Sequence, residues 1–380
     1  VVNLAGFLHF LWNDISTLQE MGYEVSVAMN ENSAAGPNLI EIPKLEEIEI
    51  AHYQVDFDTK SPISRQNVQA YKQLKLILKR NKYELIHCHT SIVGILTRMA
   101  ARKERKDGTT VIYTTHGFAF TDRSSKKSWL VYFTTEKLMS RFCDAIITIN
   151  HEDYNNAKKM HCPNVYVIPS VGLDNKRFAD VKTNRDEYRA SFGVKPNDHM
   201  VLSVGELSSR KNQKIIVDAL GMIDRKEQYV FVICGTAVVN STIEEELKRK
   251  ASELGVRIFL AGHRLDIPEI NHCADVAVIP SIREGFGMTG VEALASGVLV
   301  VGSDVQGIRE YVIPEKTGYL CDPYSPNQFA DAIEKIVNLS PEVKKQMEAS
   351  CKKKAEEFDV SKSIAAMKNI YKEVLYHDRK

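Results

Sequence analysis

Two glutamates and several glycines stand close together in one short stretch of the chain, residues 283–294, with the sequence REGFGMTGVEAL. Glu284 and Glu292 are eight positions apart, and we predict that the first lies on a loop and the second within the helix that follows. Glycines allow a ligand to approach the backbone closely, and the amides at the start of a helix suit an anion such as a diphosphate. The two carboxylates are then best explained as acceptors for hydroxyl groups, one set on a sugar and one on a ribose.

The same stretch also contains the pattern G-x-G-x-x-G at residues 285–290, and Asp304 follows the first of these glycines by 19 residues. This is the spacing of the dinucleotide fingerprint, so an NAD-dependent dehydrogenase is an alternative. However, residues 281–284 separate the glycines from the preceding strand, and the pattern lies about four strands into its domain. The fingerprint normally opens its domain directly after the first strand, so we favour the interpretation based on the two carboxylates.

Two arrays of short apolar strands and amphipathic helices must position these residues. The first array is predicted over residues 1–168 and the second over residues 200–376, with a linker at 169–197 that contains one short helix at 185–192. Such alternation is typical of parallel sheets covered on both faces. The fold class is therefore predicted as α/β, with two Rossmann-like doubly wound domains facing across a ligand cleft. In the first array, helices are predicted at 7–21, 65–81, 92–105 and 126–142.

The composition is that of a globular enzyme, with 44% hydrophobic and 26% charged residues in a chain of 380. It excludes a disordered chain, a collagen-like chain and a small disulfide scaffold. The cysteines number seven and form no C-x-x-C motif, so we expect buried free thiols in a reducing compartment. No stretch has the ~20 apolar residues of a membrane helix. The opening residues Val1-Val2-Asn3 have the pattern of a strand end, and we expect a few residues to precede them.

Charge is unevenly distributed along the chain, although the net charge is only +1. Residues 60–141 contain 17 basic and 5 acidic residues, whereas residues 1–59 contain one basic and ten acidic residues. The basic segment predicts an anionic partner or an anionic membrane surface, with solvated helix faces as the alternative. Nucleic acid is not expected, because no recognised binding motif accompanies the charge. The candidates for this membrane or acceptor surface are Arg98, Arg102, Arg105, Lys106, Arg123, Lys126, Lys127 and Trp129, and Leu130, Tyr132 and Phe133 are further apolar candidates beside Trp129.

Over essentially its whole length the chain resembles the retaining family-4 glycosyltransferases of the GT-B fold, and among them the bacterial capsular and exopolysaccharide enzymes. The most specific stretches are REGFGMTGVEALASG (283–297) and VVGSDVQGIREYV (300–312). Further stretches are HCHTSIVG (87–94), TTHGF (114–118), VGELSSRKN (204–212) and LAGHRLDIPEINHCADVAVIPS (260–281).

The resemblance implies an N-terminal acceptor domain at 1–170 and a C-terminal nucleotide-sugar donor domain at 171–360, with the helix 361–380 crossing back to the first domain. The implied enzyme is a hexosyltransferase that moves a sugar, with retention, from a nucleotide-sugar to a glycan or lipid-linked saccharide acceptor in cell-surface polysaccharide synthesis. A UDP-sugar is the expected donor. Neither a cofactor nor a metal is implied. The expected location is the cytoplasm or the inner face of the cytoplasmic membrane, with peripheral association to anionic lipid.

The resemblance also assigns roles to residues. It implies that Glu284 contacts the donor sugar at its reacting face, that Glu292 holds the ribose, and that Lys211 with a nearby arginine binds the diphosphate. Many members carry arginine where this chain has Glu206, so Arg210 is the substitute. His116 is expected near the donor sugar and the leaving phosphate. The other expected donor-binding residues are Gly6, Gly235, Thr236, Arg264, Ile267, Gly285, Phe286, Gly287, Met288 and Thr289.

Several alternatives stay open at this point. A sugar-nucleotide epimerase of the same fold would act without any acceptor, and a non-catalytic nucleotide-sugar sensor is disfavoured because both glutamates and Lys211 are present. Asp56-Phe57-Asp58 forms a D-x-D, the metal-binding signature of the other glycosyltransferase fold, and we interpret it as a coincidence. His87 and His89 alternate along one strand edge and are predicted to be structural.

Overall fold

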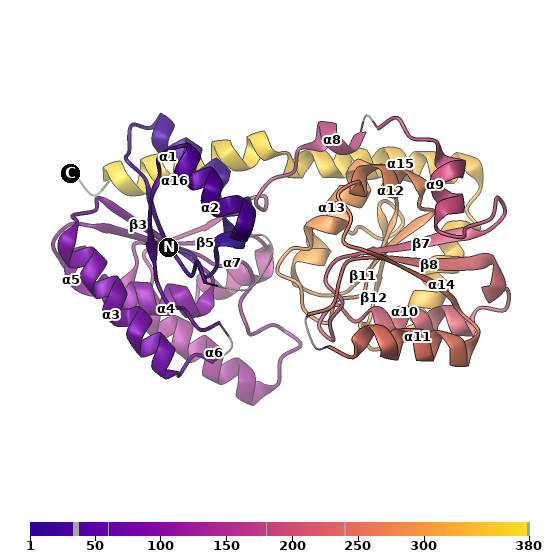
Figure 1. Ribbon diagram of the computed structural model, residues 1–380, viewed down its shortest axis with the longest axis horizontal. Helices are drawn as coiled ribbons and strands as arrows, with labels where there is room; N and C mark the ends of the chain where they lie inside the picture. The colour runs from indigo at the N-terminus through magenta and orange to yellow at the C-terminus, as the bar shows by residue number, and fades with distance from the viewer. Residues whose placement is uncertain (33–37, 60, 180, 239–240, 378–380) are drawn as a thin grey trace. The chain divides into compact units, whose positions relative to one another are not determined.

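The chain divides into two compact units (Figure 1). Unit 1 comprises Val1–Val171 together with Ser361–Lys380, and unit 2 comprises Gly172–Val360. Both units are α/β structures with parallel strands, as the alternation of strands and helices predicts. The computed structural model describes residues 1–32, 38–59, 61–179, 181–238 and 241–377.

Unit 1 is built on a two-stranded sheet of order β1-β2 and a four-stranded sheet of order β3-β4-β5-β6. The strand β5 is fully buried, which explains its uninterrupted apolar pattern. Val1–Asn3 bonds to both sheets, because Val2 N donates to Ala28 O and His89 N donates to Val1 O, each at 3.0 Å. The elements are η1 (Ala5–Phe10), α1 (Trp12–Glu20), β1 (Ser26–Met29), α2 (Asn38–Glu47), β2 (Ala51–Gln54), α3 (Arg65–Arg80), β3 (Leu85–His89), α4 (Ser91–Ala100), α5 (Arg102–Lys106), β4 (Thr110–Thr114), α6 (Lys126–Met139), η2 (Ser140–Phe142), β5 (Ala145–Thr148), α7 (His151–Ala157), β6 (Asn164–Val167) and α16 (Val360–His377).

Unit 2 is built on one parallel sheet of order β12-β11-β10-β7-β8-β9. The strands β8 and β10 are buried along their whole length, and helices cover both faces of the sheet (Figure 1). The elements are α8 (Asn175–Ala179), α9 (Arg185–Ser191), β7 (His199–Val204), α10 (Gln213–Met222), η3 (Lys226–Gln228), β8 (Tyr229–Cys234), α11 (Ile243–Leu254), β9 (Arg257–Gly262), α12 (Ile267–Cys273), β10 (Val276–Ile279), α13 (Met288–Ala295), β11 (Val300–Ser303), η4 (Gln306–Glu310), β12 (Gly318–Cys321), α14 (Pro326–Val337), α15 (Pro341–Ala355) and η5 (Glu356–Phe358).

The structure differs from the predicted elements mainly near the N-terminus. The predicted helix 7–21 is a 3-10 helix, η1, followed by α1. Ala5, Leu8 and Leu11 are all buried, and this spacing of three residues matches the 3-10 repeat better than the α-helical one. The predicted helix 92–105 is interrupted at Ala101, which separates α4 from α5. The helix α5 buries none of its residues, so packing against the core does not favour a continuous helix there.

Some short elements were not predicted at all. The helix α2 contains Pro43, which is unfavourable in a helix interior. The helices α7 and α12 have seven residues each and are too short for a clear apolar period. The predicted linker, residues 169–197, contains α8, which was not predicted, and α9, which confirms the short helix predicted at 185–192.

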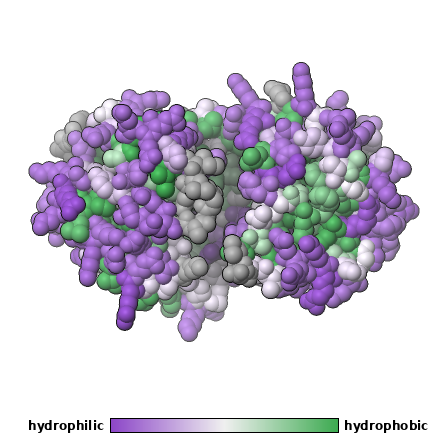
Figure 2. Space-filling view, in the orientation of Figure 1, coloured by the Kyte–Doolittle hydropathy of each residue, from purple (hydrophilic) through white to green (hydrophobic). Residues whose placement is uncertain are grey.

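Most of the surface seen in Figure 2 is hydrophilic, and hydrophobic residues gather over part of unit 2. Among the described residues, no helix combines the length and the apolar character needed to cross a bilayer.

Candidate active site

The carboxyl ends of β7 and β10 mark the point where the strand order of unit 2 reverses. The strand β7 lies between β10 and β8, and all three are parallel. In open α/β sheets, ligands bind outside the carboxyl ends of the strands at such a switch point. The loop after β7 carries Arg210 and Lys211, and the loop after β10 carries Glu284, so the fold brings together charged residues more than 70 positions apart.

The carboxylate of Glu284 is buried and surrounded by donors. Lys211 Nζ lies 2.6 Å from its Oε2, Ser281 Oγ donates to the same oxygen at 3.1 Å, and Arg210 Nη1 lies at 3.4 Å. Burial by itself would raise the pKa of Glu284, but the charges of Lys211 and Arg210 and the hydrogen bonds outweigh it and hold this pKa below its usual value. Glu284 is therefore ionised at neutral pH.

Local backbone contacts hold the two cations in place. The Lys211 amide donates to Ser208 Oγ at 3.3 Å, and Arg210 is the more exposed of the two, with 42% of its side chain accessible. Asn212 adopts a left-handed conformation with φ of 58°. Its side chain donates to the carbonyls of Pro280, at 3.2 Å, and Pro323, at 2.8 Å. These bonds tie the loop after β7 to the loops after β10 and β12.

Glu292 has surroundings opposite to those of Glu284. It lies in the second turn of α13, and no hydrogen bond or ion pair of its carboxylate is found among the described residues. Burial raises the pKa of Glu292 to about 7, and only the more distant charge of Arg177 acts against this. The two glutamates of the motif therefore differ in charge state near neutral pH, one ionised and paired, the other half-protonated and free of protein partners in the described part of the chain.

The glycines between the glutamates have packing roles around Tyr311. A Cβ atom at Gly290 would lie 2.4 Å from the Tyr311 hydroxyl oxygen, and one at Gly287, where φ is 84°, would lie 2.9 Å from it. The hydroxyl of Tyr311 is buried without a hydrogen-bond partner in the described structure. Close packing against this ring accounts for two of the glycines in the G-x-G-x-x-G pattern, which weakens the dehydrogenase alternative.

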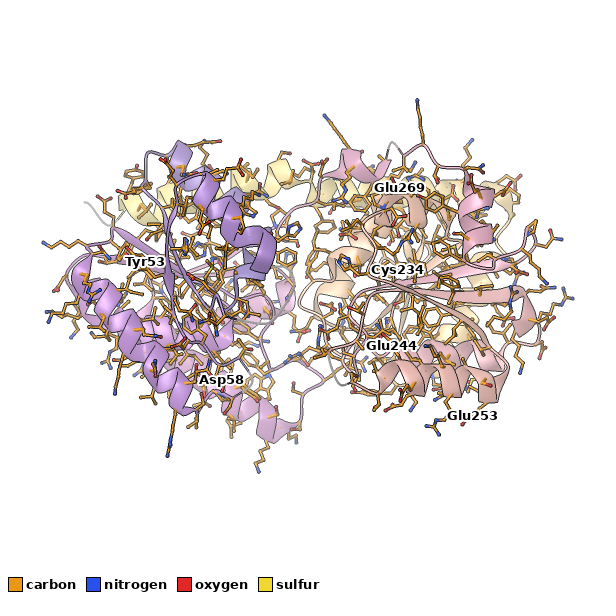
Figure 3. All side chains as sticks on the ribbon, in the orientation of Figure 1. Tyr53, Asp58, Cys234, Glu244, Glu253 and Glu269 are labelled. Carbon is orange, nitrogen blue, oxygen red and sulfur yellow. The ribbon has the colours of Figure 1, made fainter. Side chains whose placement is uncertain are left out.

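The other candidates of unit 2 are placed as follows. Gly235 and Thr236 follow β8, whose last residue Cys234 is labelled in Figure 3, and Thr236 O accepts from Leu207 N at 3.0 Å. Arg264 pairs with Asp266, its Nε lying 2.8 Å from Oδ1.

At the motif itself, Met288 is the first residue of α13, and the Thr289 hydroxyl is buried with no partner within the described chain. Ile267 begins α12. The Phe286 side chain is buried, its ring centroid 5.2 Å from that of Phe358, so this side chain belongs to the interior of unit 2 and not to a ligand-contacting surface.

In unit 1, His116 lies just beyond the end of β4 and forms part of a group of histidines. Its Nε2 lies 3.2 Å from Nδ1 of His89, the last residue of β3. Burial lowers the pKa of His116 to about 4, so the ring is neutral at physiological pH. The link from His89 to His116 was missed from the sequence, although the H-x-H pattern at a strand end beside TTHGF offered a signal. Gly6 lies within η1 and not in an open loop.

A metal site is not assigned in either unit. Asp14, His87 and His89 are the one set of possible ligands found among the described residues, with ligand atoms within 4.8 Å of one another. However, His87 already bonds Thr114 Oγ1 at 2.7 Å through Nε2 and Tyr371 Oη at 2.9 Å through Nδ1. A metal would have to displace one of these hydroxyls.

The D-x-D motif, interpreted from the sequence as a coincidence, takes part in local hydrogen bonds. The Asp56 carboxylate accepts from the side-chain amides of Gln54 and Gln73, each at 2.8 Å, and of Gln69, at 3.1 Å. The backbone amide of Asp58, labelled in Figure 3, donates to Asn67 Oδ1 at 3.0 Å. These bonds fasten the loop after β2 to α3.

The structure corrects part of the predicted basic surface. Arg98 is fully buried and pairs with Glu136 at 2.7 Å, so it cannot face a partner. Arg105 pairs with Asp144 at 2.6 Å, and the guanidinium of Arg102 lies 4.3 Å from the Phe142 ring centroid.

Much of the exposed part of this surface lies on α6 (Lys126–Met139). Trp129 is packed against the core, stacked on Phe133 with ring centroids 4.4 Å apart, contrary to its predicted place at a membrane. Of the other apolar candidates on α6, Leu130 and Tyr132 are exposed, as are Val131 and Leu138, whereas Phe133 is packed against the core. Arg123, Lys126, Lys127 and, on α5, Lys106 are exposed basic residues.

Comparison with known proteins gives consistent results for both halves of the chain. Residues 11–171 match the family model Glycosyltransferase Family 4, and residues 184–358 match the model Glycosyl transferases group 1. EpsD of Bacillus subtilis strain 168, a protein assigned to the glycosyltransferases, is 31% identical over 376 residues, which cover 98% of this chain and 93% of EpsD.

Two further relatives extend this comparison. The Escherichia coli UDP-Gal:alpha-D-GlcNAc-diphosphoundecaprenol alpha-1,3-galactosyltransferase is 29% identical over 326 residues, 82% of each chain. The crystal structure of Anabaena Alr3699/HepE in complex with UDP-glucose has the same fold, with a TM-score of 0.76 at 18% identity over 97% of this chain and 98% of that chain. Together with the near full-length similarity to EpsD, these findings confirm the resemblance seen in the sequence: the chain belongs to glycosyltransferase family 4 and is an enzyme of the GT-B fold.

Proposed function

We propose that this glycosyltransferase transfers a sugar from a UDP-sugar, with retention at the anomeric carbon, to a glycan or lipid-linked saccharide acceptor of cell-surface polysaccharide synthesis. The observation that carries the proposal is the ionised Glu284 bonded to Lys211 and Arg210 at the switch point of unit 2. Eight residues later, Glu292 has no partner for its carboxylate among the residues that the structure describes. The printed names of the Escherichia coli galactosyltransferase and of the Anabaena complex support a uridine diphosphate donor.

The charges of this site suit the departure of a nucleoside diphosphate. Cleavage of the bond between sugar and phosphate leaves negative charge on the diphosphate, and fixed cations stabilise it as it develops. In this proposal Lys211 and Arg210 supply that charge, Glu284 accepts hydroxyls of the sugar, and Glu292 accepts the ribose hydroxyls. Because Lys211 is bonded to Glu284 before the donor arrives, donor binding exchanges one anionic partner of Lys211 for another.

The test is incubation of the enzyme with a panel of UDP- and GDP-sugars and a saccharide acceptor, with release of free nucleotide as the readout. UDP released together with an elongated acceptor supports the proposal. Release of UDP with an altered free sugar in the absence of any acceptor would instead identify a sugar-nucleotide epimerase. A Lys211→Met variant should lose most nucleotide release, and Lys214→Met, at the exposed start of α10, is the matched control.

The exposed face of α6 supports a second part of the proposal, that the acceptor is reached at an anionic membrane surface. Leu130, Val131 and Tyr132 are 62%, 55% and 46% exposed, and Lys126 and Lys127 stand at the start of the same helix. Apolar and aromatic residues beside lysines favour the interface of an anionic bilayer, where each cation contributes about 1 kcal/mol. The name of the Escherichia coli relative includes a diphosphoundecaprenol acceptor, which is an anionic lipid carrier.

Sedimentation with vesicles tests this part separately. The enzyme should bind phosphatidylglycerol vesicles and not phosphatidylcholine vesicles, and binding should fall with salt. The double variant Lys126→Glu/Lys127→Glu should lose binding, whereas Lys345→Glu/Lys353→Glu, exposed on α15, makes the same charge change elsewhere and should retain it. Equal binding to both kinds of vesicle, or to neither, would favour a soluble acceptor.

A further inference from the structure

The ends of β3 and β4 bring two imidazole rings into contact. The register of these parallel strands places His89 opposite Thr114, and His116 follows two residues later. The chain turns at once after each ring, with φ of 65° at Thr90 and 115° at Gly117. The separation between Nδ1 of His89 and Nε2 of His116 is 3.2 Å, within hydrogen-bond distance.

The turn that carries His116 is held by backbone contacts on both sides. Before it, the Thr115 amide donates to Ile147 O at 2.9 Å. After it, the Phe118 amide donates to a carboxylate oxygen of Asp153 at 3.1 Å. The His116 ring also packs edge-on against Phe7, with centroids 4.8 Å apart. The ring position is therefore fixed by the fold, and what remains to be set is which of its nitrogens carries the proton.

Two neutral imidazoles that share a hydrogen bond have two possible arrangements. Burial lowers the pKa of both His89 and His116, so a single proton lies between them. If His89 Nδ1 donates, the proton of His116 is on Nδ1, and that nitrogen is a donor. If His116 Nε2 donates, Nδ1 of His116 is an acceptor. In a neutral histidine, the hydrogen bond made by one ring nitrogen thus determines whether the other nitrogen is a donor or an acceptor.

We propose that His89 is a positioning residue that donates from Nδ1 to Nε2 of His116, so that His116 presents an Nδ1–H donor to the substrate. The inference rests on the proposed function, because a sugar diphosphate is anionic and its oxygens accept hydrogen bonds. A lone pair on His116 Nδ1 would repel such an oxygen. A neutral donor also needs no protonation step.

The groups around His89 agree with this arrangement. On its own strand, His87 lies with its ring centroid 4.1 Å away, but both nitrogens of His87 are bonded to Thr114 and to Tyr371 of α16. From α1, the carboxyl of Asp14 has an oxygen within 4.8 Å of a ring nitrogen of His89. When ionised, this carboxyl would attract a proton to Nε2 of His89 and reverse the arrangement. Burial raises the pKa of Asp14 to about 7, so at pH 6 this carboxyl is mostly protonated.

The proton positions are measured directly by long-range ¹H–¹⁵N NMR of the full-length enzyme labelled with ¹⁵N-histidine at pH 6. The signals of His116 are assigned by their loss in His116→Gln. The expected result is a protonated Nδ1 and an unprotonated Nε2 on His116. A protonated Nε2 on His116 overturns the proposal. This measurement uses the wild-type protein, so it is independent of the folding of any His89 variant and of the identity of the sugar donor.

Three substitutions of His89 test the consequence for turnover. His89→Asn places an amide N–H where Nδ1 stood, His89→Asp has nearly the same shape with acceptors only, and His89→Leu has neither. We expect Asn to stay within about threefold of wild-type kcat, and Asp and Leu to lose at least about tenfold, with unchanged KM for the UDP-sugar. Equal kcat for Asn and Leu would show that His89 only fills space and would overturn the proposal. His161→Asn, an exposed histidine of unit 1, is the control.

Failure of the proposed function gives a different pattern. If no UDP-sugar is turned over by wild type, or if His116→Gln turns over like wild type, the assignment of His116 to the reaction fails. The NMR result on His116 would still decide the hydrogen-bond direction on its own.

Discussion

Replacing Glu284 by glutamine should separate substrate binding from turnover, because this carboxylate and the nucleotide compete for the same cation. In the structure Lys211 Nζ lies 2.6 Å from Glu284 Oε2, and the two side chains are only 16% and 13% exposed. A hydrogen bond that involves a charged group contributes about 1.5–3 kcal/mol, and we place the ion pair with Glu284 at the upper end of this range and the bond from the same Lys211 ammonium to a neutral glutamine oxygen at the lower end. The difference, about 1.5 kcal/mol, no longer opposes the transfer of Lys211 to a diphosphate, which corresponds to about tenfold tighter UDP binding.

Turnover should move in the opposite direction. Glutamine cannot stabilise positive charge at the reacting sugar as a carboxylate does, and we expect kcat to fall about 100-fold, equivalent to about 2.7 kcal/mol of transition-state stabilisation. Isothermal titration calorimetry with UDP and nucleotide release from the UDP-sugar measure the two effects. Glu292→Gln is the matched control, since its carboxylate has no cation partner among the described residues, and it should weaken UDP binding severalfold. Weaker UDP binding to Glu284→Gln would refute the competition between carboxylate and diphosphate.

Three other predictions follow from single observations. Burial raises the pKa of Glu292 from 4.5 to about 7, so the ionised carboxylate destabilises the folded protein most above pH 7. Glu292→Gln should therefore raise the free energy of unfolding by about 1–3 kcal/mol at pH 8, seen as a higher Tm, and leave it unchanged at pH 4.5. An equal increase at both pH values would contradict this explanation. Arg98→Met should lower the free energy of unfolding, measured with urea, by about 3–5 kcal/mol because it leaves the buried Glu136 without its cation. The double variant Arg98→Met/Glu136→Leu should recover most of this free energy. Activity should persist in chelator, and full loss with recovery on adding manganese would return Asp56 to consideration as a ligand despite its three amide donors.

The fold could be predicted because its signals are local and repeated. Buried strands such as β8 and β10 are continuous apolar runs, and long helices such as α14 have a clear apolar face. Elements that depend on tertiary contacts were not predicted. The 3-10 helix η1 exists because Ala5, Leu8 and Leu11 reach the core together, and nothing in the local propensities distinguishes it from the start of α1.

For the site, the sequence could identify residue types but not their partners. The cations of the loop after β7 and the glutamate of the loop after β10 were expected to share a ligand, but their direct pairing depends on two strands that are adjacent in space and distant in sequence. The same limit applies to Arg98, which composition places in a basic surface and which the packing of α4 against α6 buries beside Glu136. Net charge along a segment counts such buried cations together with exposed ones.

The two glutamates of the motif share a residue type, and their surroundings give them different properties. Glu284 stands at the end of a loop where two cations and Ser281 can reach it, so the folded protein favours its ionised form. Glu292 stands on a helix against buried surface, where the folded protein gains nothing from its charge and loses stability by holding it. A carboxylate retained at a net cost to stability is characteristic of a position under functional constraint. Hydroxyl groups of a bound nucleotide would supply hydrogen bonds that Glu292 does not receive from the described part of the chain, and the pKa of Glu292 should then fall when UDP binds. Proton release on UDP binding, measured by calorimetry in buffers of different ionisation enthalpy near pH 6.5, tests this directly, and binding without proton release in wild type would remove Glu292 from the nucleotide site.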